Sequence, residues 1–284
     1  MPRPFRFGVT MLADSGSRTV WQDKARQVED LDYDVLLLPD HLSMPAPFPA
    51  LLSAAEVTAL RVGTSVLNAG FYRPALLARD VAEADQLTEG RLELGLGAGY
   101  AEAEFVAAGL PFPSAGKRLE HLADTVGELR RMFASGSPAV YQQPGPPLML
   151  AGDGDRMLRL AATEADVVGF AGWSLAKPGV DPQKALAERV EFVRVAAGER
   201  FGRLELNLLV PAVSVSGELD LSVVRRTAPD LDDEHILRMP SVLYGSAQQI
   251  AETLHGYRQE LGLTYFTVLD LHMTEFAKVI KQLR

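Results

Sequence analysis

The stretch RPALLARDVAEADQLTEGRLELGLGAGY, residues 73–100, decides the fold class. Pro74 suits the first turn of a helix, because its missing N–H is not needed there. The apolar residues that follow recur at helical spacing: Leu77, Val81, Ala84 and Leu87. Gly90 is typical of a position just beyond a helix end, and alternating leucines come after it. The stretch therefore predicts a helix over 74–88 and a strand over 91–98.

Three glycines lie in or just after this predicted strand, at Gly95, Gly97 and Gly99. Their density first suggests a dinucleotide-binding loop of the form GxGxxG. That pattern fails, because the third glycine position holds Tyr100 when counted from Gly95 and Glu102 when counted from Gly97. Glycines inside a strand instead indicate a close approach of backbone. For Gly95, simple relief of crowding is an equally good explanation, whereas Gly97 and Gly99 fall where a barrel binds its ligand.

Short apolar runs alternate with longer amphipathic segments along the whole chain. The predicted strands cover residues 5–11, 34–39, 61–68, 91–98, 147–151, 166–170, 204–213 and 263–270. The predicted helices cover residues 19–31, 48–59, 74–88, 116–134, 154–164, 181–197, 246–261 and 273–283. Strands that are apolar throughout and alternate with helices are typical of a buried parallel sheet. Eight such units predict an α/β fold, a (β/α)8 TIM barrel, as a single domain over residues 1–284.

Two segments have no regular pattern. Residues 135–147 are rich in Pro, Gly and Ser and predict a loop. Residues 214–245, after the seventh predicted strand, contain the acidic run DLDDEH at 230–235. This insertion is either a lid over a site or a solvated excursion, and the sequence leaves both open.

Composition excludes several classes of function. The chain has a net charge of −9 and no long basic run, which argues against a nucleic-acid partner. It has no cysteine, and its five histidines do not have the spacing of metal ligands, so no metal site is expected. The N-terminus lacks the apolar core of a signal peptide, and no apolar run has spanning length. We therefore expect a cytoplasmic protein without a membrane partner.

In a (β/α)8 barrel the chemistry gathers at the C-terminal ends of the strands. The residues at these predicted ends are Met11, Asp40, His41, Thr64 to Asn68, Gly97 to Tyr100, Gly152 to Arg156, Ala171 to Trp173, and Pro211. They include few acids and bases, which indicates that a cofactor performs the reaction. Asp40 and His41 are the best side-chain candidates. The run GDGDR at 152–156 begins a helix and predicts either an anion site or a tight turn capped by aspartate.

These residues also carry a family resemblance. PDH at 39–41, GTSVLNAGFYRPALLARDVAEADQLTEGRLELGLGAGYAEAEF at 63–105, PLMLAGDGDRMLRLAATEADVVGF at 147–170 and SVLYGSAQQIAETL at 241–254 resemble the luciferase-like monooxygenase superfamily. More narrowly, they are similar to its coenzyme F420-dependent oxidoreductases of actinobacterial type. The resemblance covers nearly the whole chain in order, and the block at 63–105 is its most specific part.

The resemblance implies a (β/α)8 barrel that holds a reduced flavin or deazaflavin at its C-terminal face. Asp40 and His41 would flank the ring, and Ser65–Val66 matches a bulge where the family often has a non-prolyl cis peptide behind the ring. Residues 97–99 would lie along the ring or its ribityl chain, and 152–156 would hold the phosphate. The implied cofactor contacts are Asp40, His41, Ser65, Val66, Asn68, Gly97, Ala98, Gly99, Gly152, Asp153, Gly154, Asp155 and Arg156.

The implied activity is hydride transfer between F420 and a small organic molecule, with reduced F420 acting on an activated C=C, C=N or C=O bond. His41 or Tyr100 would donate the proton, and Met11 and Trp173 would contact the substrate. Asp153 departs from the family by placing a negative charge in the phosphate loop. Tyr100 stands where the family's sugar-phosphate dehydrogenases have a catalytic glutamate, so glucose 6-phosphate is not the expected substrate.

Two alternatives remain open at this point. One is an FMNH2-dependent monooxygenase on the same barrel, with FMN in place of F420. The other is a barrel that has lost its cofactor and has a binding or non-redox role, a reading that Asp153 supports. A homodimer is also left open.

Overall fold

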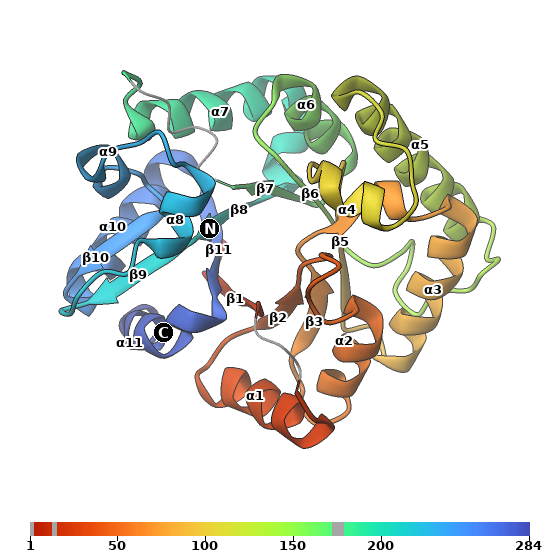
Figure 1. Ribbon diagram of the computed structural model, residues 1–284, viewed down its shortest axis with the longest axis horizontal. Helices are drawn as coiled ribbons and strands as arrows, with labels where there is room; N and C mark the ends of the chain where they lie inside the picture. Colours follow the sequence, from red (N-terminus) through yellow and green to blue (C-terminus); the bar gives the residue numbers. More distant parts are fainter. Residues whose placement is uncertain (1–2, 13–15, 172–178) are drawn as a thin grey trace.

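Parallel strands close into a barrel in the computed structural model, which describes residues 3–12, 16–171 and 179–284 (Figure 1). In chain order the barrel strands are β1 (Arg6–Thr10), β2 (Val35–Leu38), β3 continued by β4 (Arg61–Thr64 and Leu67–Asn68), β5 (Leu92–Gly97), β6 (Leu148–Ala151), β7 (Val167–Phe170), β8 (Glu205–Val210) and β11 (Leu263–Leu269). β1 pairs with β2 and β11, and β3 pairs with β5, so the sheet closes on itself. The predicted (β/α)8 barrel is confirmed.

Helices ring the strands (Figure 1). They are α1 (Arg18–Asp30), α2 (Pro47–Ala55), α3 (Pro74–Leu87), α4 (Glu102–Ala107), α5 (Ala115–Ala134), α6 (Asp155–Glu164), α7 (Pro182–Ala197), α10 (Ala247–Leu261) and α11 (Met273–Leu283), with 3-10 turns η1 (Ala69–Phe71), η3 (Gly198–Arg203) and η4 (Asp270–His272). In α3, Leu77, Val81 and Ala84 are buried, but Leu87 is 59% exposed, so the predicted apolar stripe ends one turn early. Among the helices described, none is long and apolar enough to span a membrane.

Local signals explain where several helices begin and end. Asp181 caps α7 by accepting hydrogen bonds from the backbone of the first turn. Ser246 and Gln249 form a reciprocal capping box at the start of α10, and Gly262 ends that helix in the left-handed conformation. Because these residues satisfy backbone groups that a helix leaves unpaired at its ends, the sequence marks these boundaries well.

The barrel is closed at the N-terminal ends of its strands. Glu93 accepts hydrogen bonds from Arg6 at 2.6 and 3.0 Å and from Arg61 at 2.5 Å. Arg6 also pairs with Glu205 at 3.1 Å. Above this ion cluster, a separate apolar group fills the barrel interior: Val35, Leu37, Met149, Val167 and Tyr265. The opposite end, at the C-terminal ends of the strands, is the one that remains open.

The third strand is interrupted between β3 and β4, where the peptide between Ser65 and Val66 is cis. The Thr64 hydroxyl bridges the gap in the ladder, since it donates to the Gly95 carbonyl and accepts from the Gly95 N–H, both at 2.8 Å. A side chain on β5 would collide with this segment. An added Cβ at Gly95 would lie 2.0 Å from the Thr64 carbonyl oxygen, and one at Gly97 would lie 2.7 Å from Val66 Cγ2.

Gly99 has the same relation to the next residue of the third strand. An added Cβ there would lie 2.2 Å from Asn68 Oδ1, and its φ of +75° also favours glycine. Positions 95, 97 and 99 thus match 64, 66 and 68 on the neighbouring strand. Close backbone approach is confirmed for Gly95, where an added Cβ would meet the Thr64 carbonyl and relief of this crowding explains the glycine. At Gly97 and Gly99 an added Cβ would instead meet the side chains of Val66 and Asn68.

The insertion after β8 is folded, which corrects the expectation of an irregular segment. The predicted strand 204–213 is split at Pro211, beyond which β9 (Ala212–Val215) pairs in parallel with β10 (Val242–Gly245). The two short helices between them are α8 (Ser222–Thr227) and α9 (Asp233–Leu237). This insert has its own apolar cluster, made of Ala212, Leu221, Val224, Ile236, Met239 and Val242.

The match between β5 and the third strand gives a stability test. Gly95→Ala should lower the free energy of unfolding by about 3 kcal/mol, the upper end of the usual cost of overpacking, because its Cβ meets backbone. Gly127→Ala is the matched control, because Gly127 lies on the exposed side of helix α5 with open space around it. This change should raise the free energy of unfolding by about 1 kcal/mol. Urea unfolding measures both, and a Gly95→Ala protein as stable as the wild type would refute the packing argument.

Candidate active site

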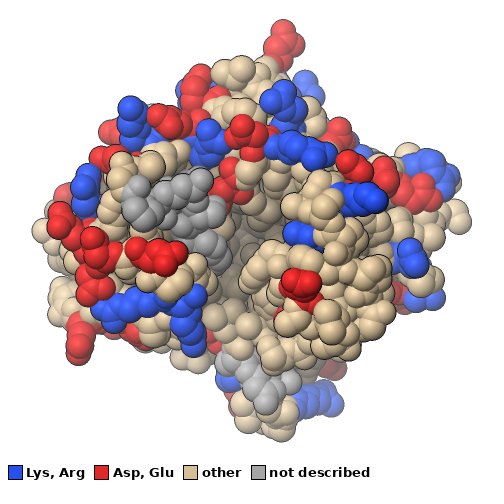
Figure 2. Space-filling view, turned by 45° about the horizontal axis from the view of Figure 1, so that its top comes forward, with Lys and Arg blue, Asp and Glu red and all other residues tan. Residues whose placement is uncertain are grey.

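A cleft of about 1050 Å³ opens at the C-terminal ends of the strands, and Figure 2 shows this face hollowed near its middle. Its volume is at the upper end for small-molecule and cofactor sites. The structure brings the predicted cofactor residues together here. Those that line the cleft are Asp40, His41, Ser65, Val66, Asn68, Gly97, Ala98, Gly99, Gly152, Asp153, Gly154, Asp155 and Arg156, together with Tyr100.

The two expected substrate contacts have different outcomes. Met11 is 1% exposed and belongs to the hydrophobic core between strands and helices, so the expectation for this residue is wrong. Side chains alternate along a strand, and its neighbours Thr10 and Leu12 line the cleft instead. Trp173 lies outside the described residues.

The floor of the cleft is made of small or apolar residues. Few side-chain atoms stand on this floor, which is lined by Gly97, Ala98, Ala151 and Gly169 together with Met149. Thr10 adds a polar group, because its buried hydroxyl forms no hydrogen bond with any residue that the structure describes. A flat apolar surface with one unused hydroxyl suits a planar ring that has polar edges.

Asp40 joins the end of β2 to the third strand. Its Oδ2 accepts a hydrogen bond from the Asn68 backbone N–H at 3.1 Å, and its carboxylate also accepts one from the Tyr72 hydroxyl. Burial raises the pKa of Asp40 above its ordinary value, and these two hydrogen bonds act in the opposite direction. Asn68 in turn accepts a hydrogen bond from the Gly70 N–H at 3.0 Å. Asp40 therefore shapes the wall of the cleft through Asn68.

His41 is held by a carboxylate that the sequence analysis did not identify. Its Nδ1 lies 3.0 and 3.1 Å from the two carboxylate oxygens of Glu104, so Nε2 is the ring nitrogen left for a group in the cleft. The His41 and Tyr100 rings pack edge to face, with their centroids 6.0 Å apart. Desolvation and the charge of Glu104 raise the pKa of Tyr100. Glu104 lies on α4, whose six residues are too few to show a helical period.

The opposite end of the cleft has the features of an anion site. Gly154 and Asp155 begin α6, and Ala115 and Gly116 begin α5, so two helix N-termini line this end. Free backbone N–H groups and the helix dipole favour a negative group at such ends. An added Cβ on Gly116 would lie 3.0 Å from Arg156 Nη1, so the glycine leaves room for this guanidinium.

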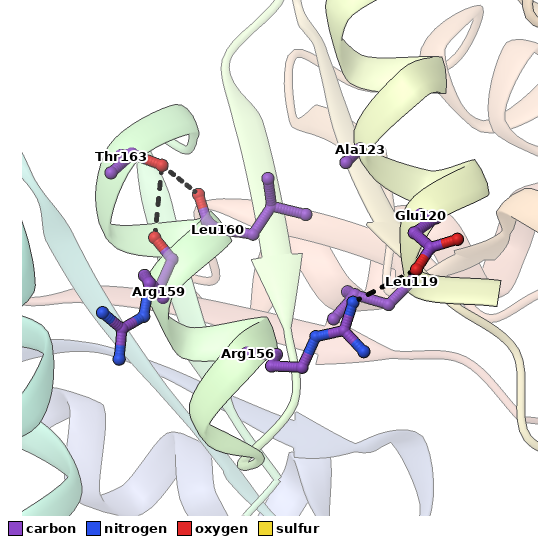
Figure 3. A pocket seen from close by; sticks show the side chains of 7 residues that line it. All are labelled: Leu119, Glu120, Ala123, Arg156, Arg159, Leu160 and Thr163. Carbon is purple, nitrogen blue, oxygen red and sulfur yellow. Dashed lines mark hydrogen bonds and ion pairs between the residues drawn. The ribbon is translucent and has the colours of Figure 1, made fainter. Parts of the chain in front are cut away.

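Arg156 lies between the cleft and a groove of about 390 Å³ that separates α5 from α6 (Figure 3). Its Nη2 is 3.5 Å from Glu120 Oε1, a long contact between two largely exposed side chains. Asp155 pairs with Arg189. Because an exposed pair at this distance is weak, Arg156 is free to turn toward an anion in the cleft. The described residues contain no cluster of three or more potential metal ligands.

Two curated relatives have different cofactors in their names. The F420-dependent glucose-6-phosphate dehydrogenase of Nakamurella multipartita is 26% identical over 189 residues, which covers 58% of this chain and 56% of the relative. The oxygenase component of the flavin-dependent trigonelline monooxygenase of Acinetobacter baylyi is 31% identical over 122 residues, or 38% of this chain and 34% of that protein. The chain thus spans about half, or less, of the length of the curated relatives it matches.

Solved structures agree on the fold over nearly the whole chain. An F420-dependent secondary alcohol dehydrogenase in complex with an F420–acetone adduct has a TM-score of 0.78 at 16% identity, covering 99% of this chain and 100% of that one. The F420-dependent tetrahydromethanopterin reductase of Methanopyrus kandleri has a TM-score of 0.77 at 16% identity, covering 99% and 98%. The model of the luciferase-like monooxygenase family matches residues 4–215, more than half of the chain, and the protein therefore belongs to that family.

Proposed function

We propose that the protein is an F420-dependent oxidoreductase that transfers a hydride between the deazaflavin and a small organic molecule. The observation that carries this proposal is one continuous cleft, with a flat floor of small residues at one end and two helix N-termini at the other. A cofactor with a planar ring and a phosphate needs both ends. The F420-dependent relatives support the choice of cofactor.

The residues at each end fit such a molecule. The small residues Gly97, Ala98 and Ala151 line the floor on which a ring would lie, and the unpartnered hydroxyl of Thr10 can bond to a ring edge. The backbone of Gly152 to Gly154 and the side chain of Arg156 would hold the phosphate. When bound, F420 supplies two-electron chemistry by accepting or giving a hydride at its ring C5.

Proton transfer is then the task of the protein. The Glu104 carboxylate orients His41 through Nδ1 and directs Nε2 to the cleft. A tyrosine carries its proton at neutral pH, and desolvation and the charge of Glu104 raise the pKa of Tyr100 further. Either group, on one rim of the cleft, would donate the proton that accompanies the hydride to an activated C=C, C=N or C=O bond. We favour this reductive direction.

The flavin-dependent relative supports a second candidate, an FMNH2-dependent monooxygenase in the same cleft. Titration of the purified protein with F420 and with FMN separates the candidates. We expect F420 to bind, with FMN at least about tenfold weaker, a difference of about 1.4 kcal/mol. Tighter binding of FMN would favour the monooxygenase, and binding of neither would favour a barrel without a redox cofactor.

Arg156 provides a local test of where the phosphate binds. Arg156→Ala should weaken F420 binding by about tenfold or more, the effect of losing a hydrogen bond to a charged group. Arg159→Ala is the matched control, because Arg159 is on the same helix and lines the groove of Figure 3 but not the cleft.

Asp153→Gly should leave F420 binding unchanged or tighten it, since it removes a negative charge near the expected phosphate. Equal effects of the two arginine changes, or loss of binding in Asp153→Gly, would refute this placement.

His41 tests the catalytic end. His41→Ala should lower turnover about a hundredfold, the lower range for loss of a general acid, and leave the melting temperature and F420 affinity almost unchanged. Glu104→Gln should lower turnover less, because it weakens the hold on His41 without removing the ring. Single-turnover kinetics and thermal melts measure the two effects. A parallel loss of folding and turnover would make His41 a structural residue.

A further inference from the structure

Two arginines, Arg156 and Arg226, line the cleft among the described residues. Arg156 lies at the end assigned to the phosphate and pairs with Glu120. Arg226 lies on α8, in the insert, and forms no ion pair with any described residue. Asp220 is its acidic neighbour. Hydrogen bonds from Ser222 lower the pKa of Asp220, and the charge of Arg226 contributes to the same shift. No described carboxylate forms an ion pair with Arg226, so its N–H donors remain available to a ligand in the cleft.

The adjacent Arg225 has a different role. Its Nη2 donates to both carboxylate oxygens of Asp233, at 2.9 and 2.8 Å, and so ties α8 to α9. Consecutive helical residues point about 100° apart, so with Arg225 engaged on α9 the side chain of Arg226 takes another direction. The cleft is where it lies.

The apolar cluster of the insert holds α8, the helix that carries Arg226. Val224 is fully buried in the insert's apolar cluster, and Leu221 is 7% exposed. On the other side of the helix, Val223 and Thr227 line the cleft together with Arg226. α8 thus has one side in a packed core and one side on the cleft. Elsewhere along the cleft, apolar side chains such as Leu12, Met44, Leu209 and Leu269 surround the remaining space.

Resting on the proposed function, we infer that the substrate is an organic carboxylate. Its charged group binds the Arg226 guanidinium, whose planar pair of N–H donors matches the two oxygens of a carboxylate. Its apolar body, which carries the reducible bond, lies against the leucine and methionine side chains. Because the adjacent Arg225 is engaged by Asp233, a single guanidinium is left for the ligand among the described residues of α8, and it suits a group with a single negative charge better than a phosphate dianion.

The test compares two probes of nearly the same shape, cinnamate and its neutral amide, by calorimetric titration of the F420-loaded protein. Cinnamate should bind the wild type at least about tenfold tighter than cinnamamide, as expected for a hydrogen bond between charged groups. Arg226→Gln should abolish this preference, and Arg226→Lys should retain part of it. Arg225→Gln, with the same change of charge one residue away, should retain the preference. Thermal melts check that each variant keeps its insert folded.

Several outcomes would overturn the inference. Equal affinity of the wild type for both probes, no binding of cinnamate, or a preference that survives Arg226→Gln would each do so. Tighter binding of styrylphosphonate than of cinnamate would replace the carboxylate with a phosphate. Weaker F420 binding in Arg226→Gln would assign this residue to the cofactor. Failure of the wild type to bind F420 removes the proposed function itself and is detected before any probe is added.

Discussion

The shape of the cleft depends on how closely β5 approaches the interrupted third strand. The Thr64 hydroxyl takes the place of two ladder hydrogen bonds to Gly95, so the break costs the sheet no unpaired backbone group there. The close approach excludes every side chain at Gly95, Gly97 and Gly99. Asn68 lies at the far end of the same segment, and its backbone N–H donates a hydrogen bond to the Asp40 carboxylate. This side of the cleft therefore combines glycine backbone with the tightly packed side chains of Val66 and Asn68.

The two ends of the barrel divide stability from function. At the closed end, Glu93 is 4% exposed and binds two arginines, an arrangement in which each charge is needed to compensate the others. At the open end, small residues and one unused hydroxyl leave space where a packed core would have side chains. The ion cluster closes one end of the barrel, and the outer core packs the strands against the helices.

Periodic signals in the sequence predicted the barrel, its helices and the residues that face the cleft, because long apolar patterns and helix caps are local properties. Short or long-range features could not be predicted. α4 has six residues and no visible period, so Glu104 was missed. Pro211 lacks an N–H, yet it lies within an apolar run that reads as one strand. β9 and β10 pair across 26 intervening residues, and no local pattern records such a pairing. The prediction for Met11 was wrong because successive side chains of a strand point to opposite sides. Met11 points into the core, whereas its neighbours Thr10 and Leu12 line the cleft.

One face of the small sheet of β9 and β10 packs in the core of the insert, and the other face packs in the main core. Ala212 and Val242 belong to the apolar cluster of the insert, whereas Val213 and Leu243 belong to the main core. Sites without shared neighbours respond to substitution almost independently. The residues of the insert's own cluster are therefore uncoupled from the barrel, whereas Val213 and Leu243 couple the insert to the barrel core.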